Sequence, residues 1–253
     1  MVGVGEDQAV QSLDFATVAA ALALTLVHLT AGKLRFLEGI PRSRWLSLAG
    51  GISVAYVFVH LLPELQEGQV ALNDSEWLPF LERDVWLIAL TGLAAFYGLE
   101  RLALTSRWRR REDSGDDSTG LAAFWVSIGS FALYNGLIGY LLLEREENGL
   151  LALTTFTFAM AVHFLVTDFS LREHHKQSYA EVGRWIVSLA LIAGWAVGLV
   201  VELSAAAITV PLAFLGGGVI LNVLKEELPT ERQSRFGPFL AGASAYAVVL
   251  LAV

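Results

Sequence analysis

Uncharged, apolar runs of about twenty residues recur along the whole chain, and they constrain its fold more than any other feature. A helix that crosses a hydrocarbon layer of about 30 Å needs roughly 20 apolar residues. Because 55% of the 253 residues are hydrophobic and only 17% are charged, a water-soluble domain would have to expose much of this apolar surface. The sequence therefore predicts an all-α membrane protein, with one transmembrane domain over residues 1–253 and short connections.

The apolar runs predict eight transmembrane helices. The least secure boundary lies at residues 202–207, where the sixth span passes into the seventh through Glu-Leu-Ser-Ala-Ala-Ala. The predicted spans are 15–32, 45–64, 85–104, 121–143, 150–168, 185–202, 206–224 and 236–253, with a cytoplasmic loop at 105–120.

Basic residues alternate between the connections as eight spans require. Fifteen of the 17 Lys and Arg residues fall on connections that would share one side of the membrane, and only Arg83 and Arg145 fall on the other. Cytoplasmic connections are enriched in positive charge, so we expect the basic side to be cytoplasmic and both termini to be extracytoplasmic. The acidic excess on the outer side would concentrate cations there, although charge sorting alone also explains it.

The start of the chain and its composition limit the compartment and the partners. The residues before Phe15 include three acids and no Lys or Arg, the opposite of a signal peptide's basic start, so we expect no cleaved leader. This pattern and the short loops suit a prokaryotic inner (plasma) membrane. The lipid bilayer is the expected partner, a homodimer is open, and nothing favours nucleic-acid binding. The absence of cysteine excludes a disulfide framework, a thiolate nucleophile and a Cys-based metal site.

Two glycine-containing segments indicate an internal repeat. Residues 50–64 align with residues 216–230, so that the glycine pairs, Val57 with Val223, and the two Leu-Pro pairs fall in register. His60 then stands opposite Glu226. The two segments belong to spans of opposite direction, so the repeat would be inverted, as in many transporters. Chance is the alternative, because Gly, Leu and Val are abundant in any membrane helix.

These features together resemble the ZIP (Zrt/Irt-like) family of metal transporters. The resemblance rests on eight spans with both termini outside, a basic connection between spans three and four, His-Leu-Leu-Pro-Glu at residues 60–64, and Leu-Pro at the end of span seven. It implies a bundle of three plus two plus three helices, in which spans 1–3 and 6–8 form the inverted repeat. It also implies a two-metal site on spans four and five.

The metal-binding motifs of that family are incomplete in this chain. The His-Asn-x-x-Asp-Gly pattern of span four corresponds to residues 134–139, which read Tyr-Asn-Gly-Leu-Ile-Gly. The His-Glu-x-Pro-His-Glu pattern of span five corresponds to residues 163–168, which read His-Phe-Leu-Val-Thr-Asp. Tyr134, Ile138, Phe164 and Thr167 therefore replace ligands. The resemblance carries over only Asn135, His163 and Asp168 as candidate ligands of a central metal site.

Each of these polar residues also has an ordinary structural explanation. His163 could be a neutral histidine that is hydrogen-bonded to a neighbouring helix, and Asn135 could join helices. Asp168 could cap its helix or pair with Arg172.

Other polar residues suggest a route for a cation. His60 and Glu64 lie one helical turn apart and are candidates for an outer entrance, and Glu226 and Glu227 for an inner exit. His28 is expected to be satisfied locally. Gly194 and Gly198 form a small-xxx-small face that favours close helix packing.

Two functions follow, and the sequence does not decide between them. The first is a divergent ZIP-like transporter that moves a divalent metal cation such as Zn, Fe, Mn or Cd into the cytoplasm, with the metal as substrate and no firm cofactor. The second is a ZIP-fold protein that has lost metal transport and serves a binding, regulatory or other-solute role. An intramembrane enzyme is not expected, because the chain has no cysteine, no His-Glu-x-x-His motif and no Ser, His and Asp set at one depth.

Overall fold

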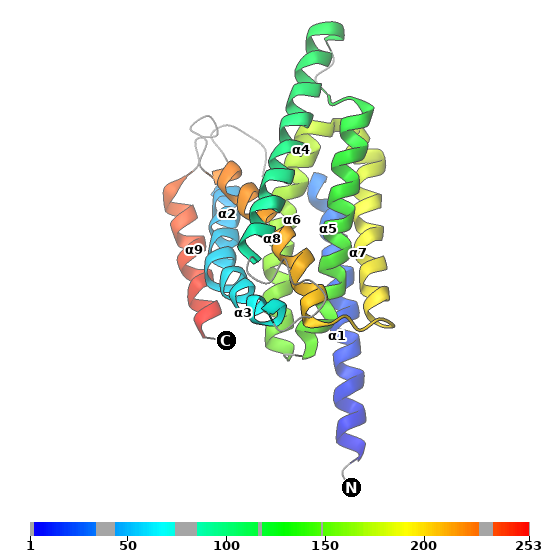
Figure 1. The fold of residues 1–253 in the computed structure, drawn as a ribbon, viewed down its shortest axis with the longest axis vertical. Coiled ribbons are helices and arrows are strands. Elements are labelled where there is room, and N and C mark those ends of the chain that lie inside the picture. Colours follow the sequence, from blue (N-terminus) through cyan, green and yellow to red (C-terminus); the bar gives the residue numbers. More distant parts are fainter. Residues whose placement is uncertain are drawn as a thin grey trace.

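The computed structural model is a bundle of long helices (Figure 1). It describes residues 3–33, 44–73, 85–115, 118–147, 149–227 and 235–252, and it describes the side chains of these residues except 3–14, 71, 144–147, 222, 226 and 227. The helices are α1 (Gly3–Thr30), α2 (Arg44–Tyr56), α3 (Leu62–Asn73), α4 (Val85–Ser114), α5 (Leu121–Glu147), α6 (Leu150–Ser178), α7 (Arg184–Gly198), α8 (Ala205–Glu227) and α9 (Phe236–Leu251). Short non-α segments are η1 (Ala31–Lys33), η3 (Val57–Leu61) and η4 (Tyr179–Gly183).

Among the described residues, six helical stretches are long and apolar enough to cross a membrane, which agrees with the predicted all-α membrane protein. One of them, Leu150–Gly198, is 49 residues long, and α9 is a shorter apolar helix. Large apolar side chains such as Leu133, 78% exposed, and Phe15, 72% exposed, cover the outside of the bundle. Lipid would cover such a surface, whereas water-soluble proteins rarely expose one.

The 49-residue stretch reverses direction after Lys176. This residue has φ 48° and ψ −120°, a backbone conformation that lies outside the helical region. The chain then passes through the π-helical turn η4 into α7, which packs along α5. Figure 1 shows α6 and α7 running in opposite directions, and both ends of the chain at the same end of the bundle.

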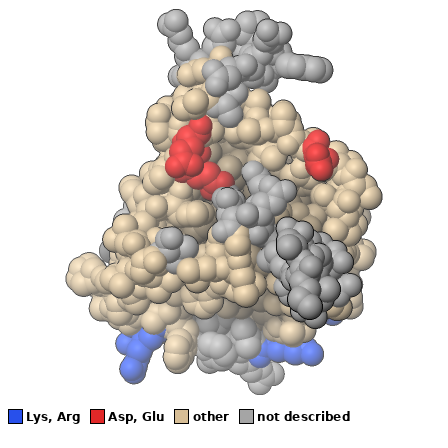
Figure 2. All heavy atoms as spheres, turned by 90° about the horizontal axis from the view of Figure 1, so that it is seen from below, with Lys and Arg blue, Asp and Glu red and all other residues tan. Residues whose placement is uncertain are grey.

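Helix α4 continues beyond the predicted end of its span at residue 104. It is helical through Ser114, so most of the segment predicted as the loop 105–120 is the tip of this helix. The opposite end of the bundle is seen in Figure 2, where acidic side chains lie among uncharged surface and Lys and Arg appear only at the margin. We call the end at the tip of α4 the basic end and the opposite end the acidic end.

Close backbone contact joins α2 to α9 at two glycines. A Cβ atom on Gly51 would fall on the carbonyl oxygen of Phe239, and a Cβ atom on Gly242 would fall on the carbonyl oxygen of Leu48. Any side chain at these two positions would therefore force the helices apart.

The same kind of contact joins α4 to α8. A Cβ atom on Gly217 would fall on the carbonyl oxygen of Ala89, and one on Gly92 would fall on the carbonyl oxygen of Phe214. A third contact joins α5 to α7, where a Cβ atom on Gly194 would fall on the carbonyl oxygen of Gly136. The last contact confirms the predicted packing role of Gly194.

Candidate functional site

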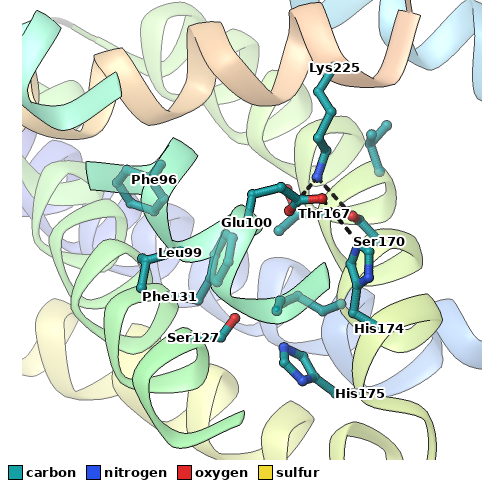
Figure 3. Close-up of a pocket in the computed structure, with 13 residues that line it drawn as sticks. Phe96, Leu99, Glu100, Ser127, Phe131, Thr167, Ser170, His174, His175 and Lys225 are labelled. Carbon is teal, nitrogen blue, oxygen red and sulfur yellow. Dashed lines mark hydrogen bonds and ion pairs between the residues drawn. The ribbon is translucent and has the colours of Figure 1, made fainter. Parts of the chain in front are cut away.

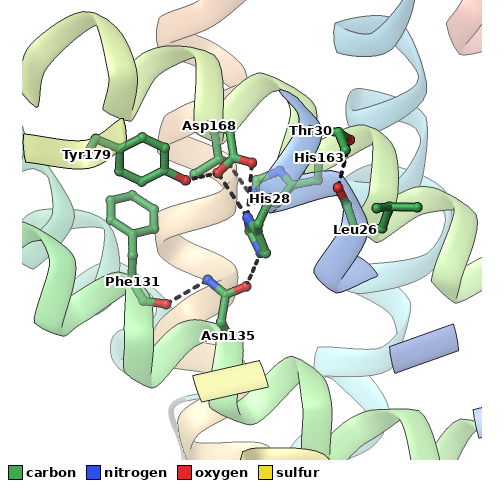
Figure 4. A network of polar contacts seen from close by, with 9 residues as sticks. Leu26, His28, Thr30, Phe131, Asn135, His163, Asp168 and Tyr179 are labelled. Carbon is green, nitrogen blue, oxygen red and sulfur yellow. Dashed lines mark hydrogen bonds and ion pairs between the residues drawn. The ribbon is translucent and has the colours of Figure 1, made fainter. Parts of the chain in front are cut away.

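The polar side chains of α6 meet two groups of partners. One group lines a cleft with α4, α5 and α8 (Figure 3). The other is a buried network with α1, α5 and η4 (Figure 4). The spacing of His163, Thr167, Ser170 and His174 puts these four residues on one face of α6, since residues three and four apart share a helix face.

His28 joins the centre of the buried network. Its Nδ1 atom lies 2.9 Å from Oδ1 and 3.0 Å from Oδ2 of Asp168, and its Nε2 atom lies 2.7 Å from Oδ1 of Asn135. His28 and Asp168 are each 1% exposed, and Asn135 is 2% exposed. The Asn135 amide also donates to the Phe131 carbonyl at 2.8 Å. Both ring nitrogens of His28 therefore have partners on other helices.

Asp168 has a second partner from the turn after α6. The hydroxyl of Tyr179 in η4 donates to its Oδ1 atom, and the Tyr179 side chain is fully buried. The reversal at Lys176 folds the chain back so that Tyr179 reaches a residue of the preceding helix. Two donors from different elements thus hold one buried carboxylate.

His163 lies beside this network and is hydrogen-bonded within its own helix. Its Nε2 atom is 3.3 Å from the Thr167 hydroxyl, and its ring is 5.7 Å from that of Tyr134. The charges of Asp168 and His28 both act on His163. The ring of Phe164 lies 4.3 Å from the ring of His28, so apolar atoms fill the place at which the ZIP pattern has an acid.

The structure thus brings together two of the three predicted central residues, Asn135 and Asp168, through His28. The expectation that His28 is satisfied locally is wrong, because its partners lie on α5 and α6. Asp168 was expected to cap its helix or to pair with Arg172, whereas the hydrogen bonds to Asp168 come from His28 and Tyr179. His28 was hard to recognise because it stands alone in an apolar run, and its partners are 107 and 140 residues away. For His174, the available sequence signal was its spacing from His163, Thr167 and Ser170, which places all four residues on one face of α6.

A metal ion fits these residues poorly as they stand. Within the described side chains, no group of three or more His, Cys, Asp or Glu residues is placed to hold a metal ion. A cation at Asp168 would have to displace His28 and Tyr179 from the carboxylate. The arrangement instead joins an imidazole and a carboxylate directly, the two kinds of side chain that hold protons in buried polar networks.

The candidates for the outer entrance lie at an irregular turn near the acidic end. His60 belongs to the π-helical segment η3, and its Nε2 atom lies 3.9 Å from Oε2 of Glu64. Pro63 accounts for the irregular turn, because a proline lacks the N–H and its ring pushes against the carbonyl four residues earlier. Both side chains are partly exposed, as an entrance would require.

The candidates for the inner exit can be located only by their backbone. Glu226 and Glu227 form the end of α8, and their side chains lie outside the described part of the structure. The preceding residue, Lys225, extends to Glu100 of α4, with Nζ 2.9 Å from Oε2. An acidic group does therefore lie near this end of α8, and it belongs to α4.

Comparison of this chain with protein-family models, curated proteins and solved structures gave no match.

Proposed function

We propose that this protein is an integral membrane transporter built on an inverted repeat, and that His28 and Asp168 form its proton-binding site. The cargo under this proposal is a solute other than a divalent metal ion, and its movement is linked to that of protons. The helix plan is ZIP-like and has eight spans, with the basic end in the cytoplasm and both termini outside.

The glycine contacts are the observation that supports the inverted repeat. Gly51 corresponds to Gly217 in the alignment of the two segments, and the same offset pairs Leu48 with Phe214, three residues before each glycine. Gly51 of α2 packs on α9, and its counterpart Gly217 of α8 packs on α4. If α2 corresponds to α8, then α9 must correspond to α4.

The second pair of glycines agrees with this correspondence. Gly242 of α9 packs on Leu48, and Gly92 of α4 packs on Phe214, which is the counterpart of Leu48. The partners also correspond, because Phe239 precedes Gly242 by three residues and Ala89 precedes Gly92 by three.

The directions of the helices add to this support. In Figure 1, α2 and α9 both run toward the acidic end, whereas α4 and α8 both run away from it. These directions are those expected of two pairs related by an axis in the membrane plane. The agreement of four close contacts, their partners and their directions supports a repeat over chance matches of abundant residues. Inverted repeats of this kind have their transport site near the middle of the bilayer, at the interface between the repeats.

The same helices support the proposed eight spans. Counting α2, η3 and α3 as one crossing, and α6 and α7 as two, gives eight apolar crossings, an even number. Both ends of the chain then lie on one side, as they do in Figure 1.

The buried His28–Asp168 pair supports proton coupling. An unpaired charge in such an interior costs several kcal/mol, whereas a matched pair is tolerated. Taking up or losing one proton leaves the pair with a net charge. The bundle must then either hydrate this charge or bind a compensating one. Such a change can bias the bundle between two conformations, which is how intramembrane His and Asp residues act in proton relays.

Proton binding can be measured before the cargo is known. We expect a pH jump on the purified protein, reconstituted on a solid-supported membrane, to produce a transient current above that of empty liposomes. Asp168→Asn should abolish this current, because an amide does not take up the proton. Asp113→Asn, which removes an exposed carboxylate at the tip of α4, should leave it unchanged. Proton coupling at this pair would be refuted by a silent parent protein, or by an undiminished current in Asp168→Asn.

Transport of a divalent metal is a second candidate, because a carboxylate, an imidazole and an amide oxygen meet in one network and all three can bind metals. Uptake of Zn, Fe, Mn and Cd into proteoliposomes separates the two functions. We expect no uptake above that of empty liposomes. Metal uptake that is lost in both His163→Ala and Asp168→Asn would favour the metal transporter.

A further inference from the structure

The cleft beside α6 contains a second cluster of ionisable side chains (Figure 3). It has a cavity volume of about 30 Å³ and lies between α4, α5, α6 and α8. Its polar lining consists of Glu100, Ser127, Thr167, Ser170, His174, His175 and Lys225. Phe96 and Phe131 form an apolar wall opposite these residues.

Glu100 is the anionic centre of this cluster. Lys225 Nζ lies 2.9 Å from its Oε2 atom, and His174 Nε2 lies 3.2 Å from its Oε1 atom. Lys225 also donates to the Ser170 hydroxyl at 3.2 Å. One carboxylate therefore stands between an ammonium group and an imidazole.

His174 is buried and has open hydrogen-bonding capacity. Its side chain is 6% exposed, and neither ring nitrogen has a hydrogen-bond partner among the described residues. The contact with Glu100 is close enough for an ion pair but lacks the geometry of a hydrogen bond. Buried polar atoms are nearly always satisfied, so an imidazole open at both nitrogens, in a cleft, is suited to receive a proton or a water molecule that carries one.

Thr167 connects the cleft to the buried network. Its side chain lines the cleft, and its hydroxyl lies 3.3 Å from Nε2 of His163. His163 in turn lies within the electrostatic reach of His28 and Asp168. The Thr167 hydroxyl therefore lies between the cleft and His163, the histidine beside the buried network.

We propose that Glu100, His174 and Lys225 form a second proton-binding site, through which protons pass between the central pair and the basic end of the bundle. This inference rests on the proposed proton coupling of His28 and Asp168. The groups that act electrostatically on Glu100 are His174, His175 and Lys225, whereas α5 contributes the uncharged Ser127 and Phe131 to the cleft.

The transfer involves protons only. In this proposal, one proton passes from the central pair to His163. His163 gives a proton to the Thr167 hydroxyl, which releases its own proton to a water molecule that enters the cleft, and His174 binds the proton from that water. Glu100 stays paired with Lys225 throughout. No bond between heavy atoms forms or breaks.

The test compares variants in the pH-jump measurement. His174→Gln keeps a polar side chain of similar length but cannot take up the proton. We expect it to slow the decay of the transient current by roughly a hundredfold, the usual size of an effect that a positioned proton-transfer group contributes. Glu100→Gln, which leaves the imidazole in place but removes its anionic partner, should slow the decay in the same direction. The control, Glu181→Gln, changes an exposed carboxylate outside the cleft and should keep the parental decay.

The outcomes separate this inference from the proposed function. Parental decay in both His174→Gln and Glu100→Gln, with the current still lost in Asp168→Asn, would overturn the cleft site and leave the central pair standing. A parent protein without any current would overturn both. If His174→Gln does not elute from size-exclusion chromatography as the parent does, Glu100→Gln decides alone.

Discussion

At the scale of single residues, the structure explains how a charge is tolerated in an apolar interior. Asp168 accepts from Nδ1 of His28 and from the Tyr179 hydroxyl, and the other nitrogen of His28 is bound to Asn135. Four side chains from α1, α5, α6 and η4 thus satisfy one another. Such a network specifies one arrangement of its helices, because any displacement leaves a polar group without a partner.

The His28–Asp168 pair should contribute to stability as a unit. Removing one partner of a buried pair typically costs about 3–5 kcal/mol, whereas replacing both by apolar residues costs far less. We therefore expect His28→Leu and Asp168→Leu each to be strongly destabilising, and the double variant to lose less than the sum. Unfolding in mixed micelles would measure these free energies. Simple additivity of the two losses would show that the residues do not interact.

Tyr179 should have a smaller effect of the same kind. Tyr179→Phe removes the hydroxyl that donates to Asp168 and keeps the buried ring. The expected loss is about 1 kcal/mol in the free energy of unfolding, the usual net value of one hydrogen bond. Tyr97→Phe is the matched control, because Tyr97 is 54% exposed and should tolerate the change. Equal effects of the two substitutions would contradict the contact.

At the scale of helices, the apolar pattern of the sequence predicted most of the structure. Apart from α1, which begins at Gly3, the helices that match predicted spans begin within one residue of the predicted start, because an uncharged run of about twenty residues has few alternatives to a membrane helix. The predicted ends were less accurate, since α3, α4 and α6 continue to Asn73, Ser114 and Ser178. The reversal at Lys176 and the extension of α4 to Ser114 were not evident, because both lie in polar sequence that is compatible with either helix or loop.

The site was less predictable than the helices. Asn135, His163 and Asp168 were singled out by their positions in two motifs, whereas His28 and Tyr179 have no local signal. The partners of a buried polar group are decided by packing between distant helices, and a single sequence does not contain that information directly. The proposed repeat rests on a weak alignment in the sequence and on the four glycine contacts of the structure.

The repeat makes a specific prediction about glycines. Gly51→Ala and Gly217→Ala should both be destabilising, because each added Cβ atom would strike a backbone carbonyl of the facing helix. Gly98→Ala and Gly129→Ala are matched controls, since neither Cβ atom would meet another atom within 4 Å. In these controls the better helix propensity of alanine should give up to about 1 kcal/mol of added stability. Unchanged stability in Gly51→Ala or Gly217→Ala would refute the close contact at that position.

At the scale of the whole molecule, the absence of cysteine makes the topology easy to test. A single introduced cysteine reports the side of the membrane on which it lies. We expect Ser118→Cys and Gln177→Cys to react only from the cytoplasmic side, and Ser204→Cys to react only from the outside. With an impermeant maleimide, Ser204→Cys should label in sealed cells, whereas Ser118→Cys and Gln177→Cys should label only after lysis. Labelling of Gln177→Cys and Ser204→Cys from the same side would contradict two crossings between residues 150 and 204.

Under the proposed function, the inverted repeat, the buried His28–Asp168 pair and the cleft belong to one plan. The repeats would supply two related halves that exchange position around a fixed centre. The pair would bind the proton, and the cleft would connect it to one side. Tyr134, Phe164 and Thr167 stand where the ZIP pattern has metal ligands, which agrees with a cargo other than a divalent metal ion.

The most direct measurement of this plan is the protonation of Asp168 itself. Infrared difference spectroscopy of the reconstituted protein, recorded between acidic and neutral pH, detects the carbonyl stretch of a protonated carboxyl group and its shift in deuterated water. We expect the parent protein to show such a band from a buried carboxyl, and Asp168→Asn to lack it while retaining the parental fold. An identical band in Asp168→Asn, or a parent spectrum without any buried carboxyl band, would show that this residue does not bind the proton.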